Sequence, residues 1–452
     1  MSHKKPIKDD SMSKRISLVS LGLLLIGSLV SAQPEQPPFN VNVPIDQLST
    51  IFTQLYGDSG LIVDSLTVLP SGDTHSAHFN SDFQSQFTQF GVALTSQLAA
   101  VPLPSPASGF TYEFDAELGV FQRSSQSFGP ILAERAETRG RGRFSFGFTY
   151  QNFRFDTIEG LDLDNVPSVF EHDGAQLGGG RIDVVSTINS IDARVNQFTS
   201  FISYGLTDRV DLSLAIPLVS TDMTVRSDAT VQRLGTSSNE QVHFYRLEGD
   251  DIGDRRIFTA SGSASGIGDL TVRLKGRMSA SSALAMDLRL PTGDEKNLLG
   301  VGAPGIRPFL ILSRSSRAFS PHVNVGYQWN GSSVLAGDPS TGQSADLPDQ
   351  ATWVIGADFG VSERFTFALD ILGNYLIDAP RLQQGTFNAR DGSSTFPTVS
   401  FETESYSLIS GAVGFKLNMV ENLLLDLNLL FTLDNNGLRD KVTPLIGFEY
   451  AF

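Results

Sequence analysis

The chain has 452 residues, of which 18% are charged, and its formal net charge is −16. A chain this acidic is a poor candidate for binding nucleic acid through the phosphate backbone. It contains no Cys, so disulfides do not stabilise it. After residue 32, no run approaches the roughly 20 apolar residues that a membrane-spanning helix needs. The length allows two or three soluble domains or one large barrel.

The N-terminus has the three parts of a secretory signal. Lys14 and Arg15 form a basic region, residues 16–30 are apolar, and Val30-Ser31-Ala32 resembles a small-residue cleavage site. An inner-membrane anchor is the alternative, but the apolar run is short and Pro-rich polar sequence follows it at once. We therefore expect residues 1–32 to be a cleaved signal peptide.

Residues 33–97 are expected to form a helical or irregular N-terminal segment. Ile45, Leu48, Phe52 and Leu55 recur at steps of three and four residues, which predicts a short amphipathic helix. A second set repeats this spacing: Phe79, Phe83, Phe87 and Phe90. The segment can either plug a barrel or remain as a periplasmic extension, and the sequence leaves both interpretations open.

From residue 98 to residue 452 the pattern predicts an outer-membrane barrel of alternating strands. Apolar residues alternate with small or polar ones, which is the period of a strand with two different faces. The predicted strands lie near residues 110–120, 144–150, 195–205, 210–218, 270–274, 284–290, 306–312, 323–329, 353–359, 365–371, 406–417, 423–431 and 442–452. A periplasmic N-terminus needs an even number, so one more strand is expected near Leu98–Leu103. The prediction is about 14 strands, with 12 as the alternative if two of them are misread.

The connections between these strands alternate between short and long. Three short ones, at 205–209, 360–364 and 418–422, are predicted to be three-residue hairpin loops. Such loops would place Phe359 opposite Phe365 and Leu417 opposite Leu423. The long connections are 157–193, 220–267, 292–305, 330–350 and 376–403. Short turns on one side and long loops on the other are typical of outer-membrane barrels, whose short turns are periplasmic.

The chain ends on an alternating strand, residues 442–452, with a bare terminal aromatic. It resembles the C-terminal recognition strand of bacterial outer-membrane barrels. Phe448, Tyr450 and Phe452 are therefore expected to be a membrane-insertion signal for the barrel-assembly machinery. A β-sandwich or propeller needs neither this ending nor a signal peptide. The predicted fold class is an all-β, transmembrane, antiparallel up-and-down β-barrel.

Charged residues on the polar face of the predicted strands would point into the lumen. A loop at residues 279–281 would place Arg273 opposite Asp287. Mixed signs indicate either a lumen cross-linked by ion pairs or one that lines a polar path. The lumen-facing candidates are Glu113, Asp115, Glu117, Arg143, Arg273, Lys275, Arg277, Asp287, Arg289, Asp358, Asp370, Asp426 and Glu449.

Catalytic and cofactor motifs are missing from the sequence. It has no His-Glu-x-x-His, no Gly-x-Ser-x-Gly and no phosphate loop with Lys. His172 and His243, in long connections, are the only candidates for a hydrolase at the outer end. Acidic clusters at residues 162–165 and 248–254 lack the spacing of a twelve-residue calcium loop, so we interpret them as solvated loops. The sequence predicts no enzyme, no metal and no cofactor.

Three stretches carry a family resemblance: residues 202–212, residues 266–275 with Gly-Ile-Gly-Asp-Leu-Thr-Val-Arg-Leu-Lys, and residues 288–294 with Leu-Arg-Leu-Pro-Thr-Gly-Asp. They resemble the outer-membrane transporter family named for the meta-pathway of phenol degradation, over roughly residues 190–452. That family is related in architecture to the long-chain fatty-acid transporter.

The barrel pattern, the missing catalytic motifs and this resemblance together predict a channel for small, hydrophobic or aromatic molecules, and uptake is expected to be passive because no energy-coupling or nucleotide motif is present. Outer-membrane lipid, lipopolysaccharide and the solute are the expected partners, without nucleic acid. The alternative is a non-transport barrel that acts through its long acidic loops in adhesion or as a structural protein.

Overall fold

The computed structural model describes residues 39–57, 60–66, 77–81, 89–94, 112–115, 120–123, 127–236, 241–247, 251–316, 318–420 and 422–452. These residues belong to one compact unit, Pro38–Phe452. The signal peptide expected at residues 1–32 and the strand expected at Leu98–Leu103 lie outside the described residues. Among the residues described, no helix is long and apolar enough to cross a membrane.

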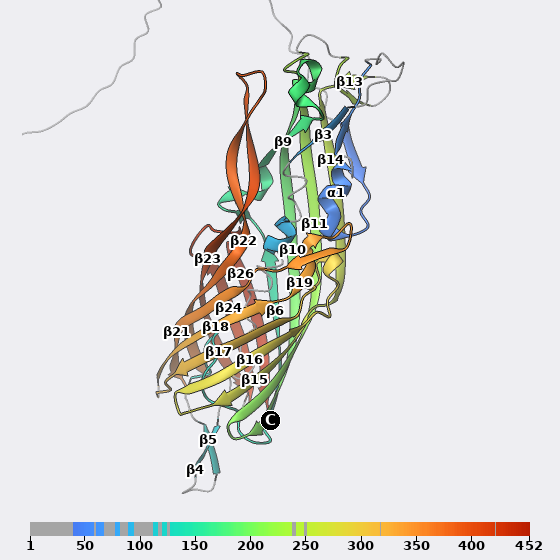
Figure 1. Cartoon of the computed structure of the whole chain (residues 1–452). Helices are drawn as coiled ribbons and strands as arrows, with labels where there is room; N and C mark the ends of the chain where they lie inside the picture. The colour runs from blue at the N-terminus through green and yellow to red at the C-terminus, as the bar shows by residue number, and fades with distance from the viewer. Residues whose placement is uncertain are drawn as a thin grey trace, which may run out of the picture. The chain divides into compact units, whose positions relative to one another are not determined.

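Within the described residues, twelve antiparallel strands close into a barrel (Figure 1). Each strand pairs with the next around the ring, and the last strand pairs with the first, with Phe448 opposite Phe148. The wall strands are β6 (Phe144–Arg154), β10 (Val184–Thr207), β11 (Val210–Gln232), β15 (Leu270–Arg277), β16 (Ser282–Leu290), β17 (Gly305–Ser313), β18 (Phe319–Asn330), β21 (Gln350–Ser362), β22 (Phe365–Asn388), β23 (Thr395–Val420), β24 (Leu423–Thr432) and β26 (Val442–Ala451). Because β26 pairs with β6, the barrel has no free strand edge, as a transmembrane barrel requires.

The expected count of fourteen strands is wrong, and the alternative of twelve is correct. The strand predicted at residues 110–120 is not in the wall: β4 (Tyr112–Asp115) and β5 (Val120–Arg123) pair with each other in a separate two-stranded sheet. Alternation indicates that a strand has two different faces, but it does not indicate which strands pair with it. With this strand removed, the parity argument for one more strand before it also fails.

The two faces of the wall strands are arranged as the alternation predicted. Outward residues such as Leu284 and Ile355 are 53% and 52% exposed, whereas inward residues such as Lys275 and Asp358 are buried. Large apolar side chains exposed around a whole wall are unfavourable in water. They are the expected outer surface of a barrel that lies in lipid.

The short turns confirm the predicted faces but not the predicted partners. Phe359 pairs with Phe367, and Leu417 pairs with Leu425, two residues beyond the positions expected. A register shift beside each turn, such as that between Gly360 and Ser362, is the cause. Because the displacement is an even number of residues, the apolar side chains of both strands still share a face.

One side of the barrel is much taller than the other. β10, β11, β22 and β23 contain 24, 23, 24 and 26 residues, whereas β15 and β16 contain 8 and 9. At about 3.3 Å per residue, a 24-residue strand is roughly 80 Å long, well beyond a hydrocarbon core of about 30 Å. The tall strands therefore extend into three stretches that were expected to be connections: 157–193, 220–267 and 376–403. β9 (Val166–His172) and β14 (Arg255–Ile267) widen this tall sheet.

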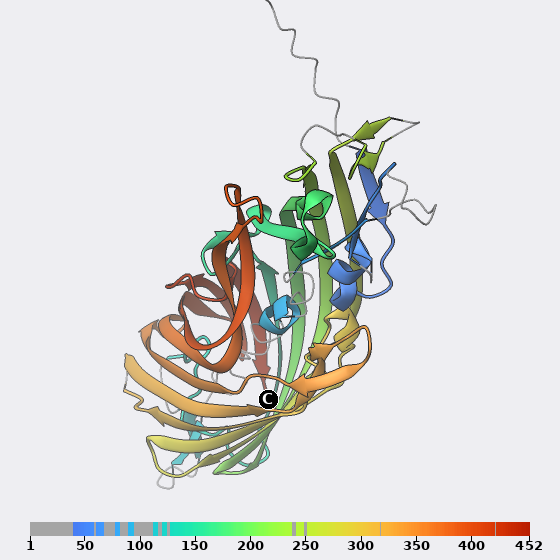
Figure 2. The same ribbon diagram turned by 45° about the horizontal axis from the view of Figure 1, so that its top comes forward.

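The described part of residues 33–97 covers the inner face of the tall strands (Figure 2). The helix predicted from Ile45 to Leu55 is confirmed as η1 (Leu48–Thr50) followed by α1 (Ile51–Tyr56). In the second set, Phe79 lies instead on β3 (Ala77–Asn80), and Phe90 lies on a helical stretch at residues 89–94. β1 (Phe39–Val43) pairs in parallel with β14, and β2 (Leu61–Val63) pairs with β3.

Short helices and strands lie in the connections between the wall strands. They are β7 (Thr157–Ile158), β8 (Leu161–Asp162), η2 (Leu163–Asn165), η3 (Ala175–Leu177), η4 (Gly179–Ile182), β12 (Tyr245–Arg246), β13 (Ile252–Gly253), η5 (Glu295–Asn297), β19 (Ser332–Asp338), β20 (Gln343–Asp346) and β25 (Leu438–Arg439).

Candidate functional site: the filled lumen and an adjoining pocket

Residues 127–140, here called the plug segment, fill the lumen of the short part of the barrel. Every residue in this range is buried, although it forms neither a helix nor a strand. It directly precedes β6. Backbone amides that are buried without secondary structure need other hydrogen-bond partners. The wall supplies them.

Side chains from strands around the ring accept hydrogen bonds from the amides of the plug segment. These acceptors are therefore part of what fixes its path. The bonds are Phe128 N to Thr366 Oγ1 (2.9 Å), Ile131 N and Leu132 N to Asp370 Oδ2 (3.2 and 3.0 Å), Glu134 N to Asn324 Oδ1 (2.6 Å), Ala136 N to Ser313 Oγ (2.9 Å), and Arg139 N to Asp211 Oδ2 (3.1 Å).

The charges of the plug segment pair with charges on the wall. Glu134 accepts hydrogen bonds from Arg273 and from Lys275 Nζ, the latter at 3.2 Å. Arg273 also donates to Asp287 through Nε at 2.6 Å and Nη2 at 2.8 Å. The predicted opposition of Arg273 and Asp287 is confirmed, because the two residues are register partners on β15 and β16.

Two further ion pairs anchor the segment on other sides of the ring. Arg135 pairs with Asp358 on β21, and Arg139 Nη2 lies 2.7 Å from Glu449 Oε1 on β26. His322 Nε2 lies 2.6 Å from Asp370, the carboxylate that also holds the plug segment. Partnered, hydrogen-bonded charges are the form in which ionised groups are tolerated in a protein interior.

The remaining lumen candidates have mixed outcomes. Arg289 and Asp426 are partly buried, with Asp426 3.8 Å from Lys416 Nζ. Arg143 directly precedes β6, and Arg277 donates to the Ser279 carbonyl at the turn end of β15. Glu113 and Asp115 lie on β4, which is not a wall strand, and Glu117 lies outside the described residues.

Sequence reasoning missed the lumen residues that come from the plug segment itself. Glu134, Arg135 and Arg139 occur between two predicted strands, in a stretch that has no alternation. The available signal was that broken period: an apolar and mixed-charge run between Gly129-Pro130 and Gly140, immediately before a strong wall strand. Such a run fits neither a strand nor a solvated loop.

Two voids border the plug segment, and both are small. One lies beside Ile131, Asp426 and Glu449, and the other beside Leu132 and Arg273, and each holds about 30 Å³. That is about the share of one water molecule in the liquid. Neither of these two voids beside the described plug segment is therefore large enough for an organic solute.

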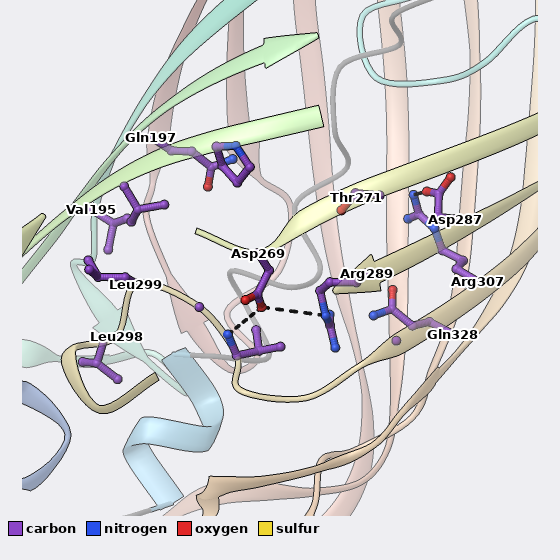
Figure 3. Close-up of a pocket in the computed structure, with 15 residues that line it drawn as sticks. Val195, Gln197, Asp269, Thr271, Asp287, Arg289, Leu298, Leu299, Arg307 and Gln328 are labelled. Carbon is purple, nitrogen blue, oxygen red and sulfur yellow. Dashed lines mark hydrogen bonds and ion pairs between the residues drawn. The ribbon is translucent and has the colours of Figure 1, made fainter. Parts of the chain in front are cut away.

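A larger pocket of about 100 Å³ lies near this region and is partly open. Figure 3 shows the side chains that line it. One wall is apolar: Val195, Pro217, Val219, Leu298 and Leu299. The opposite wall is polar: Asp269, Asp287, Arg289, Arg307 and Gln328. Apolar linings with a few polar groups are typical of small-molecule sites. Asp287 connects the pocket to the plug segment, because Arg273 bonds both Asp287 and Glu134.

The polar wall of the pocket is held by a well-bonded carboxylate. Asp269 accepts from Gly293 N at 3.0 Å and from Val301 N at 2.8 Å, which folds residues 293–301 over the pocket. Gly300 is required there, since a Cβ at this position would lie 2.4 Å from Asp269 Oδ1.

His172 and His243 lie close together at the end of the barrel formed by the tall strands, with ring centroids 5.0 Å apart. His243 Nδ1 lies 2.7 Å from Asp183 Oδ2, and Asp183 Oδ1 accepts from Gly235 N at 2.7 Å. Burial alone raises the pKa of Asp183, but hydrogen bonds from His243, Thr236 and Gly235 outweigh it and hold the pKa below its usual value. The cluster ties the upper loops together. Within the described ranges, no group of three or more His, Cys, Asp or Glu is placed to hold a metal ion.

A closed barrel with an apolar exterior and a filled polar lumen defines a β-barrel of the outer-membrane type. Residues 172–433 match the family model described as "Putative MetA-pathway of phenol degradation". The match covers more than half of the sequence, and the chain belongs to this family. Among curated proteins, none matches the sequence.

Solved structures with a similar fold include the COG4313 outer membrane channel from Pseudomonas putida F1, at 15% identity and a TM-score of 0.42 over 70% of this chain and 98% of that one. A Pseudomonas aeruginosa FadL homologue has 9% identity and a TM-score of 0.30 over 69% of this chain and 89% of that one. The CymD monoaromatic hydrocarbon channel has 9% identity and a TM-score of 0.33, with the same coverages.

Proposed function

We propose that this protein is an outer-membrane channel for the passive uptake of small hydrophobic molecules, aromatic ones included. The observation that carries the proposal is a half-apolar pocket that is linked, through Asp287 and Arg273, to a segment that fills the lumen. A barrel that acts only in adhesion or as a structural protein has no use for this arrangement. The family description, which names phenol degradation, supports a small aromatic solute.

In this proposal the plug segment moves aside to let a solute pass. It is held through side chains of the wall and has no continuous backbone ladder of its own. Side-chain hydrogen bonds contribute only about 0.5–1.5 kcal/mol each, or about 1.5–3 kcal/mol when one group is charged. Such bonds can be exchanged one at a time. We found no sequence motif for energy coupling or nucleotide binding, so diffusion is the proposed mechanism.

The proposal also includes the route to the membrane. Residues 1–32 are removed on export, and the barrel-assembly machinery binds the terminal strand through Phe448, Tyr450 and Phe452. The outer surface then contacts lipid and lipopolysaccharide. Short turns face the periplasm, and the tall strands face the outside of the cell.

The test is uptake of a labelled neutral aromatic by cells that carry the protein in an otherwise tight outer membrane. A matched variant combines Ala136→Cys with Ser313→Cys, because Ala136 N and Ser313 Oγ are only 2.9 Å apart. The chain has no Cys of its own, so this pair is the only thiol pair present. We expect uptake to be fast in the native protein, slow in the oxidised variant and fast again after reduction. Equal uptake with and without the protein would contradict the proposal.

A further inference from the structure

Two arginines in the pocket keep hydrogen-bond donors available for a ligand. Arg289 donates from Nη2 to Asn330 Oδ1 at 2.7 Å and from Nε to the Ala303 carbonyl at 3.3 Å. Its nearest carboxylate oxygen, on Asp269, is 4.0 Å from Nε. Among the described residues, Nη1 of Arg289 has no hydrogen-bond partner. Its guanidinium is therefore largely buried, with its one carboxylate partner at the long distance of 4.0 Å, a state that favours an added anion.

Arg307 lies on the neighbouring strand and is also only partly satisfied. Its Nη2 donates to Asp287 Oδ2 at 2.5 Å, and its guanidinium lies over the Phe309 ring at 5.3 Å. In the described part of the chain, its Nε and Nη1 have no hydrogen-bond partner. β16 and β17 pair Asp287 with Arg307 and Arg289 with Gly305, so the two arginines lie two register positions apart on the same wall.

The acidic groups of the pocket are already occupied. Asp269 accepts from two backbone amides, and Asp287 accepts from Arg273 and Arg307. A ligand cation would find these carboxylates bonded, whereas a ligand carboxylate would find open guanidinium donors. Arginine presents such donors in a fork that matches the two oxygens of a carboxylate.

The apolar wall opposite the arginines and the volume of the pocket limit the size and polarity of the rest of the ligand. Val195, Val219, Leu298 and Leu299 offer no polar side-chain atom, and Figure 3 shows Val195, Leu298 and Leu299 across from Arg289. The cavity of about 100 Å³ is somewhat smaller than one of about 150 Å³ that holds benzene, but it is partly open. It therefore suits a single ring or a short chain and excludes a long acyl chain.

We infer that this pocket is a binding site for a small aromatic or short aliphatic carboxylate, bound through Arg289 and Arg307. The inference rests on the proposed channel function and names the class of solute that the channel selects. The anion would compete with Asp287 for Arg307. Asp287 also accepts from Arg273, which bonds Glu134 of the plug segment, so the pocket and the plug segment share one hydrogen-bond network.

The test is calorimetric titration of the full mature protein, in detergent, with benzoate, benzylamine and toluene. Benzoate should bind saturably, and benzylamine should not bind. Arg289→Gln removes the charge but keeps an amide that can bond Asn330, and it should weaken benzoate binding roughly tenfold to hundredfold, the size of a charge-assisted hydrogen bond. Its effect on toluene should be small. Arg289→Lys should recover part of the affinity for benzoate.

The matched control is Arg255→Gln, which removes a partly exposed arginine paired with Asp228 far from the pocket and should leave benzoate binding unchanged. Folding of each variant is checked by its electrophoretic mobility before and after heating. Equal binding of benzoate to the native protein and Arg289→Gln, or a preference for benzylamine, would overturn the inference. Uptake of neutral aromatics without benzoate binding would leave the channel standing and reject this site. Benzoate binding without any uptake would support this site and reject the channel function.

Discussion

At the scale of single residues, buried charge pairs lie beside small apolar clusters inside this barrel, such as the one that Ile131 and Leu132 form with Val354. Glu134, Arg273 and Asp287 are each less than a tenth exposed, and each makes at least two charged contacts. Removing one member of a buried pair is far more damaging than the net stabilisation by that pair suggests, because the other member stays buried without its partner. The lumen network should therefore be sensitive to single substitutions.

Arg273→Met tests this sensitivity. It removes the guanidinium between Glu134 and Asp287 and should lower the free energy of unfolding by about 3 kcal/mol, the lower end of the range for breaking a buried pair, because Lys275 and Arg307 remain. Arg194→Met is the control, since its pair with Asp192 is exposed and should change stability by less than about 1 kcal/mol. Urea unfolding in detergent measures both. Equal effects would show that the lumen pair is not special.

Asp183 gives a prediction about pH. Its folded pKa lies below its usual value, so its bonds to His243, Thr236 and Gly235 stabilise the upper loops above the unfolded pKa of about 3.9. That stabilisation is lost as the pH falls from about 4 through the folded pKa. Hydrogen-exchange protection factors at residues 241–247 should therefore drop between pH 6 and pH 3. Asp183→Asn should have low protection at both pH values; unchanged protection in the native protein would contradict the assignment.

At the scale of elements, wall strands could be predicted from the sequence and the plug segment could not. A wall strand such as β16 can be predicted from its own residues, because Leu284, Met286 and Leu288 alternate with residues of the other face. The plug segment takes its conformation from distant partners: Glu134 bonds a side chain 190 residues away and Arg139 one 310 residues away. No local period encodes such contacts. The pairing of Arg273 with Asp287 was predictable because one short turn joins their strands.

Replacing residues 131–137 by a Gly-Ser linker of the same length tests the plug segment as an element. The change removes the side chains that pair with Asp358, Arg273 and Lys275 and should leave the wall intact. Single-channel recording should then show a higher conductance and longer open times than in the native protein. The control is a Gly-Ser replacement of Ser393 and Ser394 at the tip of the β22–β23 hairpin. A conductance equal to that of the native protein would show that another segment closes the lumen.

At the scale of the whole molecule, the barrel has a short side and a tall side. The sequence predicted where strands meet at short turns, because those turns are flanked by alternating residues, but it did not predict that β10 and β22 continue far beyond the apolar belt. There the outward residues turn polar, and alternation against lipid is no longer required. Asp378 marks the change on β22, with a positive φ of 49° and a register shift between Leu376 and Ala379.

The proposed orientation predicts which end of the molecule reagents reach from outside the cell. Ser393→Cys lies at the tip of the tall β22–β23 hairpin, and Glu363→Cys lies in the short turn before β22. Because the chain has no Cys, each variant carries a single thiol. A membrane-impermeant maleimide should label the first variant on intact cells and the second only after the cells are opened. The opposite pattern would invert the orientation.

The place of the plug segment in the chain has a consequence for how the barrel is assembled. Gly140 ends the segment four residues before β6 begins, and Gly142 N donates to the Gly205 carbonyl of β10 at 2.8 Å. On the other side, Arg139 reaches Glu449 of β26, the strand that is synthesised last. The seam between the first and last strands therefore carries a contact that exists only when the interior is already occupied. We therefore expect zipping of that seam and filling of the interior to be coupled during assembly, because the Arg139–Glu449 contact needs both.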